Sequence, residues 1–213
     1  MRISFLCSDE SHPVNDYLLK WIETHSIHNC ELVRKKTELS GGDILFLISC
    51  SEIVRPEDRE AYQASLVLHA SDLPQGRGWS PHIWAILDGA DEITLSLLEA
   101  EDKVDSGRIW YKLPFSVPKH ALWHEINERL FDAELKLISL AVDNFDSVTP
   151  YDQKTEIEAS YYPRRTPEDS RIDPNQSLDS QFDKLRVCDP NRFPAFFEAH
   201  GKKYKIILEK FDE

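Results

Sequence analysis

A histidine and an aspartate in this sequence stand where two side chains could share acid–base chemistry. His69 ends an apolar run at residues 66–68 and is followed by a loop rich in proline and glycine. Asp105 lies about one helix and one strand further along and precedes Ser106 and Gly107. An imidazole exchanges protons near neutral pH, and a carboxylate can fix its orientation. The pattern therefore indicates a His–Asp site; the alternatives are a structural histidine at a strand end and an aspartate in an ordinary turn.

The elements that would position this pair alternate between strand and helix. The residue pattern predicts strands at 3–7, 31–34, 43–49, 66–69, 93–99 and 107–112, with helices at 16–24, 56–60 and 81–88. Residues 43–49 form a continuous apolar run, as in a central parallel strand that is buried on both faces. We therefore expect an α/β fold, Rossmann-like and doubly wound, with a mainly parallel sheet and helices on both faces. Such sheets bind ligands at the carboxyl ends of their strands, where His69 stands.

The remainder of the chain predicts an appendage to this sheet. A long amphipathic helix is expected at residues 119–142, a connector at 149–163, a short helix at 177–187, and two strands at 193–197 and 203–210 joined at Gly201. We expect residues 1–144 to form the α/β domain and residues 145–213 to form a C-terminal extension with a helix and a β-hairpin. A lone hairpin is only marginally stable, and Phe196 and Phe197 cannot both point inward on a strand, so we expect the hairpin to help form a homodimer.

The segment after His69 carries a family resemblance. Residues 69–81 are His-Ala-Ser-Asp-Leu-Pro-Gln-Gly-Arg-Gly-Trp-Ser-Pro, residues 84–89 are Trp-Ala-Ile-Leu-Asp-Gly, and residues 105–107 are Asp-Ser-Gly. This pattern resembles the formyltransferase family that uses 10-formyltetrahydrofolate, and it is most similar to the branch that formylates amino sugars carried on nucleotides. The resemblance covers residues 1–144, which would be the formyltransferase catalytic domain, and extends loosely to the C-terminus.

The resemblance implies roles for individual residues. His69 and Asp105 would be the catalytic pair. The residues that would bind the co-substrate 10-formyltetrahydrofolate are Ser51, Glu52, Ile53, Val54, Glu101, Asp102 and Val104. Without the resemblance, both of these segments are ordinary loops.

The resemblance places the acceptor beside the loop after His69. The residues that would contact the acceptor are Ser71, Arg77 and Trp79, although Trp79 could equally be a packing residue. Arg164 and Arg165 could meet a pyrophosphate, or they could form a solvated surface pair. Gly76-Arg77-Gly78 lacks the spacing of a nucleotide phosphate loop.

One position departs from the family pattern. Val67 stands two residues before the histidine, where the family has an asparagine that donates a hydrogen bond to the developing oxyanion. Removing one such donor typically costs ~2.7–4 kcal/mol of transition-state stabilisation. A hydroxyl of Ser49, Ser51 or Ser71 could donate instead, as could a backbone amide or a water; otherwise the chain is a weak or inactive member.

The composition of the chain limits the kinds of partner and site that we expect. The 213 residues carry a formal net charge of −13, which argues against nucleic acid as a partner. No apolar run reaches the ~20 residues that a membrane span needs. The cysteines lack Cys-x-x-Cys spacing, so we expect no metal site and expect free thiols in a reducing cytoplasm; they are Cys7, Cys30, Cys50 and Cys188.

The resemblance implies a cytoplasmic N-formyltransferase that moves a formyl group from 10-formyltetrahydrofolate to the amine of a nucleotide-linked amino-dideoxy sugar. One alternative is an enzyme like methionyl-tRNA formyltransferase, which carries a larger basic C-terminal domain that we do not expect here. Another is a non-catalytic relative that binds folate or a sugar. The nucleotide, the sugar and the position of its amine stay open.

Overall fold

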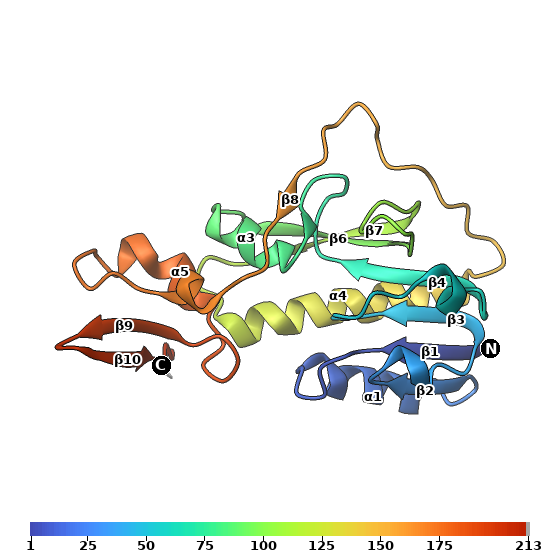
Figure 1. Cartoon of the computed structure of the whole chain (residues 1–213), viewed down its shortest axis with the longest axis horizontal. Coiled ribbons are helices and arrows are strands. Elements are labelled where there is room, and N and C mark those ends of the chain that lie inside the picture. The colour runs from blue at the N-terminus through green and yellow to red at the C-terminus, as the bar shows by residue number, and fades with distance from the viewer. Residues whose placement is uncertain (212–213) are drawn as a thin grey trace.

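A six-stranded sheet forms the centre of the protein in the computed structural model of Figure 1, which describes residues 1–211. In the order in which they lie side by side, the strands are β2 (Asn29–Val33), β1 (Arg2–Leu6), β3 (Gly42–Leu47), β4 (Tyr62–His69), β6 (Glu92–Glu99) and β7 (Ile109–Ser116). The first four run parallel, whereas β6 and β7 run antiparallel to their neighbours. The expected α/β fold with a mainly parallel sheet is confirmed.

The direction of β6 follows from the length of the helix before it. α3 (Pro81–Leu87) has only 7 residues, whereas β4 has 8. At ~1.5 Å per helical residue and ~3.3 Å per strand residue, α3 covers well under half the length of β4. The chain therefore does not return to the starting edge of the sheet. It enters β6 from the edge where β4 ends, and His69 pairs with Ser96.

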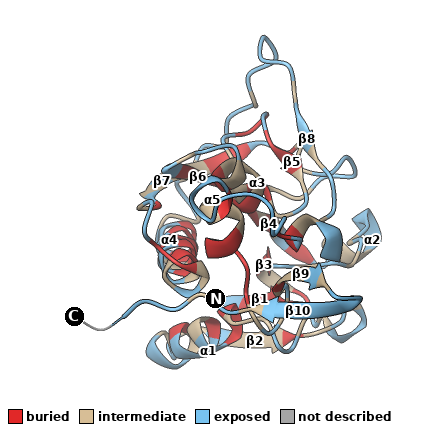
Figure 2. Cartoon of the chain, turned by 90° about the vertical axis from the view of Figure 1, so that its left-hand side faces the viewer, coloured by how far each residue is buried: buried red, intermediate tan, exposed pale blue. Residues whose placement is uncertain are grey.

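Two helices cover one face of the sheet. α1 (Val14–Thr24) and α4 (Trp123–Asp143) pack on apolar side chains from β1, β3 and β4, and Trp21 of α1 donates a 2.9 Å hydrogen bond to Ser139 of α4. Figure 2 shows the buried side of α4 facing the strands. The other face carries a smaller cluster that includes Leu45 and Leu47, covered by loops and by the short helices η1 (Lys36–Glu38) and α2 (Pro56–Arg59). β3 is thus buried on both faces, as its continuous apolar run predicts.

The long helix begins later than the sequence pattern suggests. Residues 118–121 form a turn, because Ala121 N–H donates to the Pro118 carbonyl and the fully buried Arg186 donates to the carbonyls of both residues. The carboxylate of Glu125 accepts the Leu122 N–H at 2.8 Å and closes the first helical turn. These long-range and capping bonds set the start of α4 at Trp123.

The C-terminal part forms a small core of its own. Its buried apolar residues are Ile172, Leu185, Cys188 and Ala195. The expected helix is shorter than predicted and is divided into η3 (Asp179–Gln181) and α5 (Phe182–Arg186). The expected hairpin is confirmed as β9 (Ala195–Ala199) paired antiparallel with β10 (Lys202–Ile206). His200 and Gly201 turn the chain with φ of 51° and 72°.

The connector after α4 returns over the sheet, as Figure 1 shows. It contains β8 (Tyr161–Tyr162), which pairs parallel with β5 (Arg77–Gly78) in the loop after His69. The sequence pattern gave no sign of this pairing. None of the helices within residues 1–211 is long and apolar enough to cross a membrane.

Candidate active site

His69 ends β4 with both ring nitrogens engaged. Its Nε2 lies 2.8 Å from the carbonyl oxygen of Gly76, and its Nδ1 lies 3.5 Å from Oδ1 of Asp105. A carbonyl oxygen only accepts, so Nε2 carries a proton and donates it to Gly76. Nδ1 therefore offers a lone pair toward the Asp105 carboxylate when the ring is neutral. This arrangement can take up one further proton between the two side chains.

Asp105 is held in a tight turn by backbone contacts. Its φ is +55°, a conformation that aspartate tolerates better than most residues, and its Oδ2 accepts the Gly78 N–H at 2.8 Å. Gly107 packs so closely on the Glu99 carbonyl that a Cβ there would overlap it. The glycine in Asp-Ser-Gly thus allows the turn to approach β6 and bring the carboxylate to His69. The side chains of His69 and Asp105 are 7% and 6% exposed.

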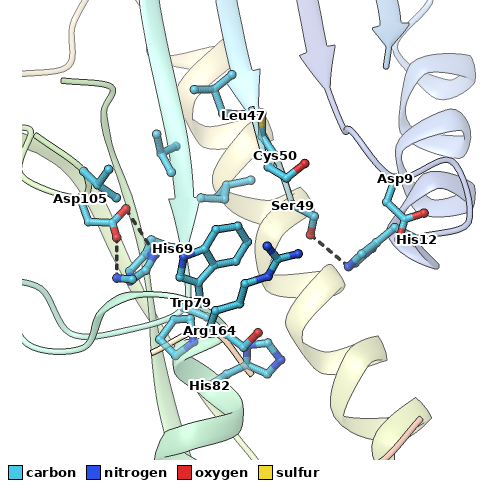
Figure 3. Close-up of a pocket in the computed structure, with 18 of the residues that line it drawn as sticks. Asp9, His12, Leu47, Ser49, Cys50, His69, Trp79, His82, Asp105 and Arg164 are labelled. Carbon is cyan, nitrogen blue, oxygen red and sulfur yellow. Dashed lines mark hydrogen bonds and ion pairs between the residues drawn. The ribbon is translucent and has the colours of Figure 1, made fainter. Parts of the chain in front are cut away.

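The pair borders a large cavity of about 840 Å³ at the carboxyl ends of β3 and β4 (Figure 3). α4 lines one side through residues spaced three and four apart, from Trp123 to Glu134. The loops after β3 and β6 line a second side, and the segment after β1, the start of α3 and the segments after β5, β8 and α5 line the remaining sides.

The loops after β3 and β6 bring together the residues expected to bind folate. All seven line the cavity: Ser51, Glu52, Ile53, Val54, Glu101, Asp102 and Val104. The side chains of Ile53 and Val104 are largely exposed and offer apolar surface there. The Glu52 carboxylate accepts the Lys36 N–H at 2.6 Å, so this side chain is already paired.

Arg59 ties these two loops together, and the sequence pattern did not single it out. Its guanidinium donates to the Ala100 carbonyl and pairs with Asp102 at 2.5 Å. The arginine comes from α2, after the β3 loop, and its partners lie after β6. Only the folded chain brings them together.

The opposite part of the cavity is rich in arginine and aromatic side chains. Trp79 lies under the Arg164 guanidinium, whose Cζ is 4.8 Å from the ring centroid. Arg165 and Arg192 stand over the Phe193 ring, and Arg192 also pairs with Asp9 at 2.8 Å. The sequence left two interpretations open for Arg164 and Arg165, as surface residues or as phosphate-binding residues. Both line the cavity. This region can accept an anionic, ring-bearing ligand.

Ser71 and Arg77 do not line the cavity. Arg77 is buried and donates to Gln153 at 2.6 Å and to the Tyr161 hydroxyl at 3.2 Å. Gln153 in turn donates to the carbonyls of Asp105 and Gly107, both at 2.9 Å. Arg77 thus holds the connector against the Asp105 turn and does not reach toward an acceptor.

The sequence pattern did not single out several buried titratable groups at the cavity. Burial raises the pKa of Glu134 on α4 to about 8, and its Oε2 has no hydrogen-bond partner among the described residues. Burial and the charge of Arg192 lower the pKa of His12 to about 4. Burial and the charge of Arg165 lower the pKa of His82 to about 3. At neutral pH all three are uncharged.

No group of three or more His, Cys, Asp or Glu side chains within residues 1–211 is arranged to hold a metal ion.

A family model for formyl transferase matches residues 4–142, which include His69, Asp105 and both loops of the cavity. The chain belongs to this family. The chain spans only part of the curated relatives that it matches by sequence. The methionyl-tRNA formyltransferase of Rickettsia bellii (strain RML369-C) is 25% identical over 174 residues, which are 81% of this chain and 56% of that protein.

Solved structures with this fold come from more than one branch. The methionyl-tRNA formyltransferase from Clostridium thermocellum superposes with a TM-score of 0.80 at 23% identity and covers 97% of both chains. A sugar N-formyltransferase from Shewanella sp. FDAARGOS_354 superposes with a TM-score of 0.75 at 13% identity and covers 100% of this chain and 99% of that chain. At these identities the likeness shows the fold alone and does not choose between the branches.

Proposed function

We propose that the protein transfers a formyl group from 10-formyltetrahydrofolate to the primary amine of a nucleotide-linked amino sugar. The observation that carries this proposal is the position of the His69–Asp105 pair. It borders one cavity that has an apolar loop region on one side and an arginine-aromatic region on the other. A two-substrate transfer needs both substrates in reach of one acid–base pair.

The region of the β3 and β6 loops suits the folate. Ile53 and Val104 offer apolar walls to a flat ring, and Glu101 and Asp102 line the cavity beside them. The bond from Arg59 to Ala100 fixes the second loop, so the binding surface is largely formed before the ligand arrives.

The arginine-aromatic region suits the nucleotide part of the acceptor. Trp79 gives a face on which a base can stack, and Arg164 and Arg165 offer planar, permanently charged donors for phosphate oxygens. The Arg165 Nε is buried and has no partner among the described residues, whereas its Nη2 donates to Ser170 at 3.0 Å.

The proposed reaction uses the hydrogen-bonding positions of His69 and Asp105. The neutral amine of the sugar attacks the formyl carbon, a carbon–nitrogen bond forms, and the bond to the folate nitrogen then breaks. Nδ1 of His69 and the Asp105 carboxylate, 3.5 Å apart, take the proton that the amine loses. The same proton is available to the departing folate nitrogen. The Gly76 carbonyl keeps the other ring proton on Nε2, so the basic nitrogen faces Asp105.

A second candidate acceptor is charged initiator tRNA, which the sequence relatives favour. The net charge of −13 works against it, because a polyanion is repelled unless a basic surface compensates. The two candidates differ in a binding measurement. We expect no binding of initiator tRNA at micromolar protein and physiological salt; micromolar or tighter binding would favour the tRNA acceptor.

The proposal is tested by release of tetrahydrofolate from 10-formyltetrahydrofolate in the presence of dTDP-, UDP- and GDP-linked 4-amino and 3-amino sugars, with methionyl-tRNA as the competing acceptor. Turnover with at least one nucleotide sugar and none with the tRNA is expected. Turnover with the tRNA alone would overturn the choice of acceptor, and folate binding without any turnover would mark a non-catalytic relative.

A further inference from the structure

Formyl transfer leaves a negative charge on the formyl oxygen for part of the reaction, and a hydrogen-bond donor must meet it. The strand that carries His69 offers no side-chain donor beside it, because Val67 and Leu68 are apolar and line the cavity. His69 itself uses its Nε2 proton on Gly76. Any further side-chain donor therefore comes from a neighbouring element.

The end of the neighbouring strand places Ser49 at the same cavity as His69. β3 and β4 run parallel with Leu47 opposite Val67, and Ser49 follows β3 at the edge of the sheet where His69 ends β4. Ser49 has a φ of +47°, a left-handed conformation that serine rarely adopts, and its side chain lines the cavity. Its conformation is costly and is maintained by the surrounding structure.

His12 determines where the Ser49 hydroxyl hydrogen can point. Val14 N–H donates to Nδ1 of His12 at 3.2 Å, so Nδ1 is an acceptor and Nε2 carries the ring proton. Nε2 lies 3.0 Å from Oγ of Ser49 (Figure 3) and donates to it. The Ser49 oxygen thus receives a hydrogen bond from His12, and its own hydrogen remains free for an acceptor in the cavity.

The ring of His12 stays neutral at working pH, so its Nε2 continues to donate the hydrogen bond to Ser49. The groups that face it are Arg192, Asp9 and Asp189, and burial together with the charge of Arg192 lowers its pKa to about 4. The ring also contacts Phe131 of α4 edge to face, with centroids 5.8 Å apart. The imidazole is therefore held in one tautomer and one orientation.

The two other serines near the pair are less well placed. Oγ of Ser71 is buried, has no hydrogen-bond partner among the described residues, and does not line the cavity. Ser51 lines the cavity, but its position is fixed through its backbone, whose N–H donates to Ser8. Ser49 alone of the three combines a place at the cavity with a bond that orients its hydroxyl.

We propose that Ser49 donates the hydrogen bond that stabilises the formyl oxygen in the transition state, and that His12 is the positioning residue that orients it. This inference rests on the proposed formyl transfer and assigns one residue to it. Preorganised donors of this kind are effective because they need not reorganise while charge develops.

The test compares Ser49→Ala with the control Ser40→Ala, an exposed serine before β3 that does not line the cavity, using the acceptor that the wild type turns over. Ser49→Ala should lower kcat by ~10²–10³-fold, since that is the usual effect of removing one oxyanion donor. Its KM for 10-formyltetrahydrofolate and its affinity for tetrahydrofolate should stay near wild type. Ser40→Ala should keep kcat within a few fold. Ser49→Asn, which tolerates this φ and offers an amide donor, should restore part of the rate.

A double-mutant cycle tests whether His12 acts by orienting Ser49. His12→Phe should lower kcat in the wild-type background and change it little in the Ser49→Ala background, because a residue that acts through Ser49 has nothing left to orient. A Ser49→Ala variant with wild-type kcat overturns the inference, as does an equal loss in folate affinity or an additive effect of His12→Phe. Absence of turnover by the wild type would instead overturn the proposed function.

Discussion

At the scale of single residues, hydrogen bonds to backbone groups decide what each functional side chain can do. The Gly76 carbonyl fixes the proton of His69 on Nε2, and the Gly78 N–H fixes one oxygen of Asp105. The sequence predicted that His69 and Asp105 come together, because a strand end and a turn with glycine were visible in it. It did not predict the protonation of either ring nitrogen, which depends on a carbonyl seven residues away.

Asp105→Asn should lower the rate of formyl transfer by ~10²-fold or more and change folate affinity only modestly. Asparagine keeps an oxygen for the Gly78 N–H and tolerates the φ of +55°, but it cannot take a proton from the amine. Calorimetry with tetrahydrofolate and initial rates together decide this. Equal losses in binding and in rate would make Asp105 a binding residue.

Glu134→Gln should alter how stability depends on pH. The pKa of Glu134 is raised from 4.5 to about 8, so between these values the unfolded chain releases a proton that the folded protein keeps. The contribution of Glu134 to the free energy of unfolding is fully present below pH 4.5 and is lost as pH rises toward 8. The variant lacks this titration, so its melting temperature relative to wild type should increase steadily from pH 5 to pH 8. Parallel melting curves would show that Glu134 has an ordinary pKa.

At the scale of elements, long-range pairing explains what local patterns missed. The apolar run of β3 was readable because both of its faces are buried, and the turn of the β9–β10 hairpin was readable from Gly201. The pairing of β5 with β8 joins residues that are 84 positions apart, as in the bond from Arg77 to Tyr161. Each of these strands has only 2 residues, too few for a period to show. The sequence did not predict that Arg77 holds the connector in place, because its partners Gln153 and Tyr161 also lie far from it along the chain.

Arg77→Met and Arg164→Met should therefore behave differently. Arg77→Met removes the buried bonds to Gln153 and Tyr161, so we expect a lower melting temperature and a lower kcat, with the KM for the acceptor little changed. Arg164→Met removes a charge at the cavity, so we expect a higher KM for the acceptor and an unchanged melting temperature. A rise in acceptor KM for Arg77→Met at wild-type stability would return Arg77 to the acceptor site.

At the scale of the whole molecule, the C-terminal part completes the cavity. We propose residues 1–144 as the catalytic domain and residues 145–213 as an extension that contributes Arg164, Arg165 and Arg192 to the acceptor region. The pair of Arg192 with Asp9 and the bonds of Arg186 to the turn before α4 join the two parts. Composition could indicate that the chain carries an excess of negative charge, but it could not reveal that Arg164, Arg165 and Arg192 meet at one cavity.

The hairpin should join two copies of the chain. Tyr204 and Ile207 are exposed apolar residues on or just after β10, and an exposed apolar patch favours association. We expect a dimer in sedimentation at micromolar concentration, and a monomer for Ile207→Asp. Leu19→Asp, a matched change at an exposed apolar position on α1, should leave the dimer intact. A monomeric wild type, or a dimer unaffected by Ile207→Asp, would contradict this assembly.

The most direct test of the account follows an isotope-labelled formyl group from 10-formyltetrahydrofolate into product, with wild type and His69→Asn compared on the same nucleotide-linked amino sugar. The wild type should place the label on the sugar nitrogen and release tetrahydrofolate in equal amount. His69→Asn should fold normally, bind tetrahydrofolate, and transfer the label ~10²–10⁴-fold more slowly, because it lacks the acid–base group. Near wild-type transfer by folded His69→Asn, or label found only on methionyl-tRNA, would contradict the account.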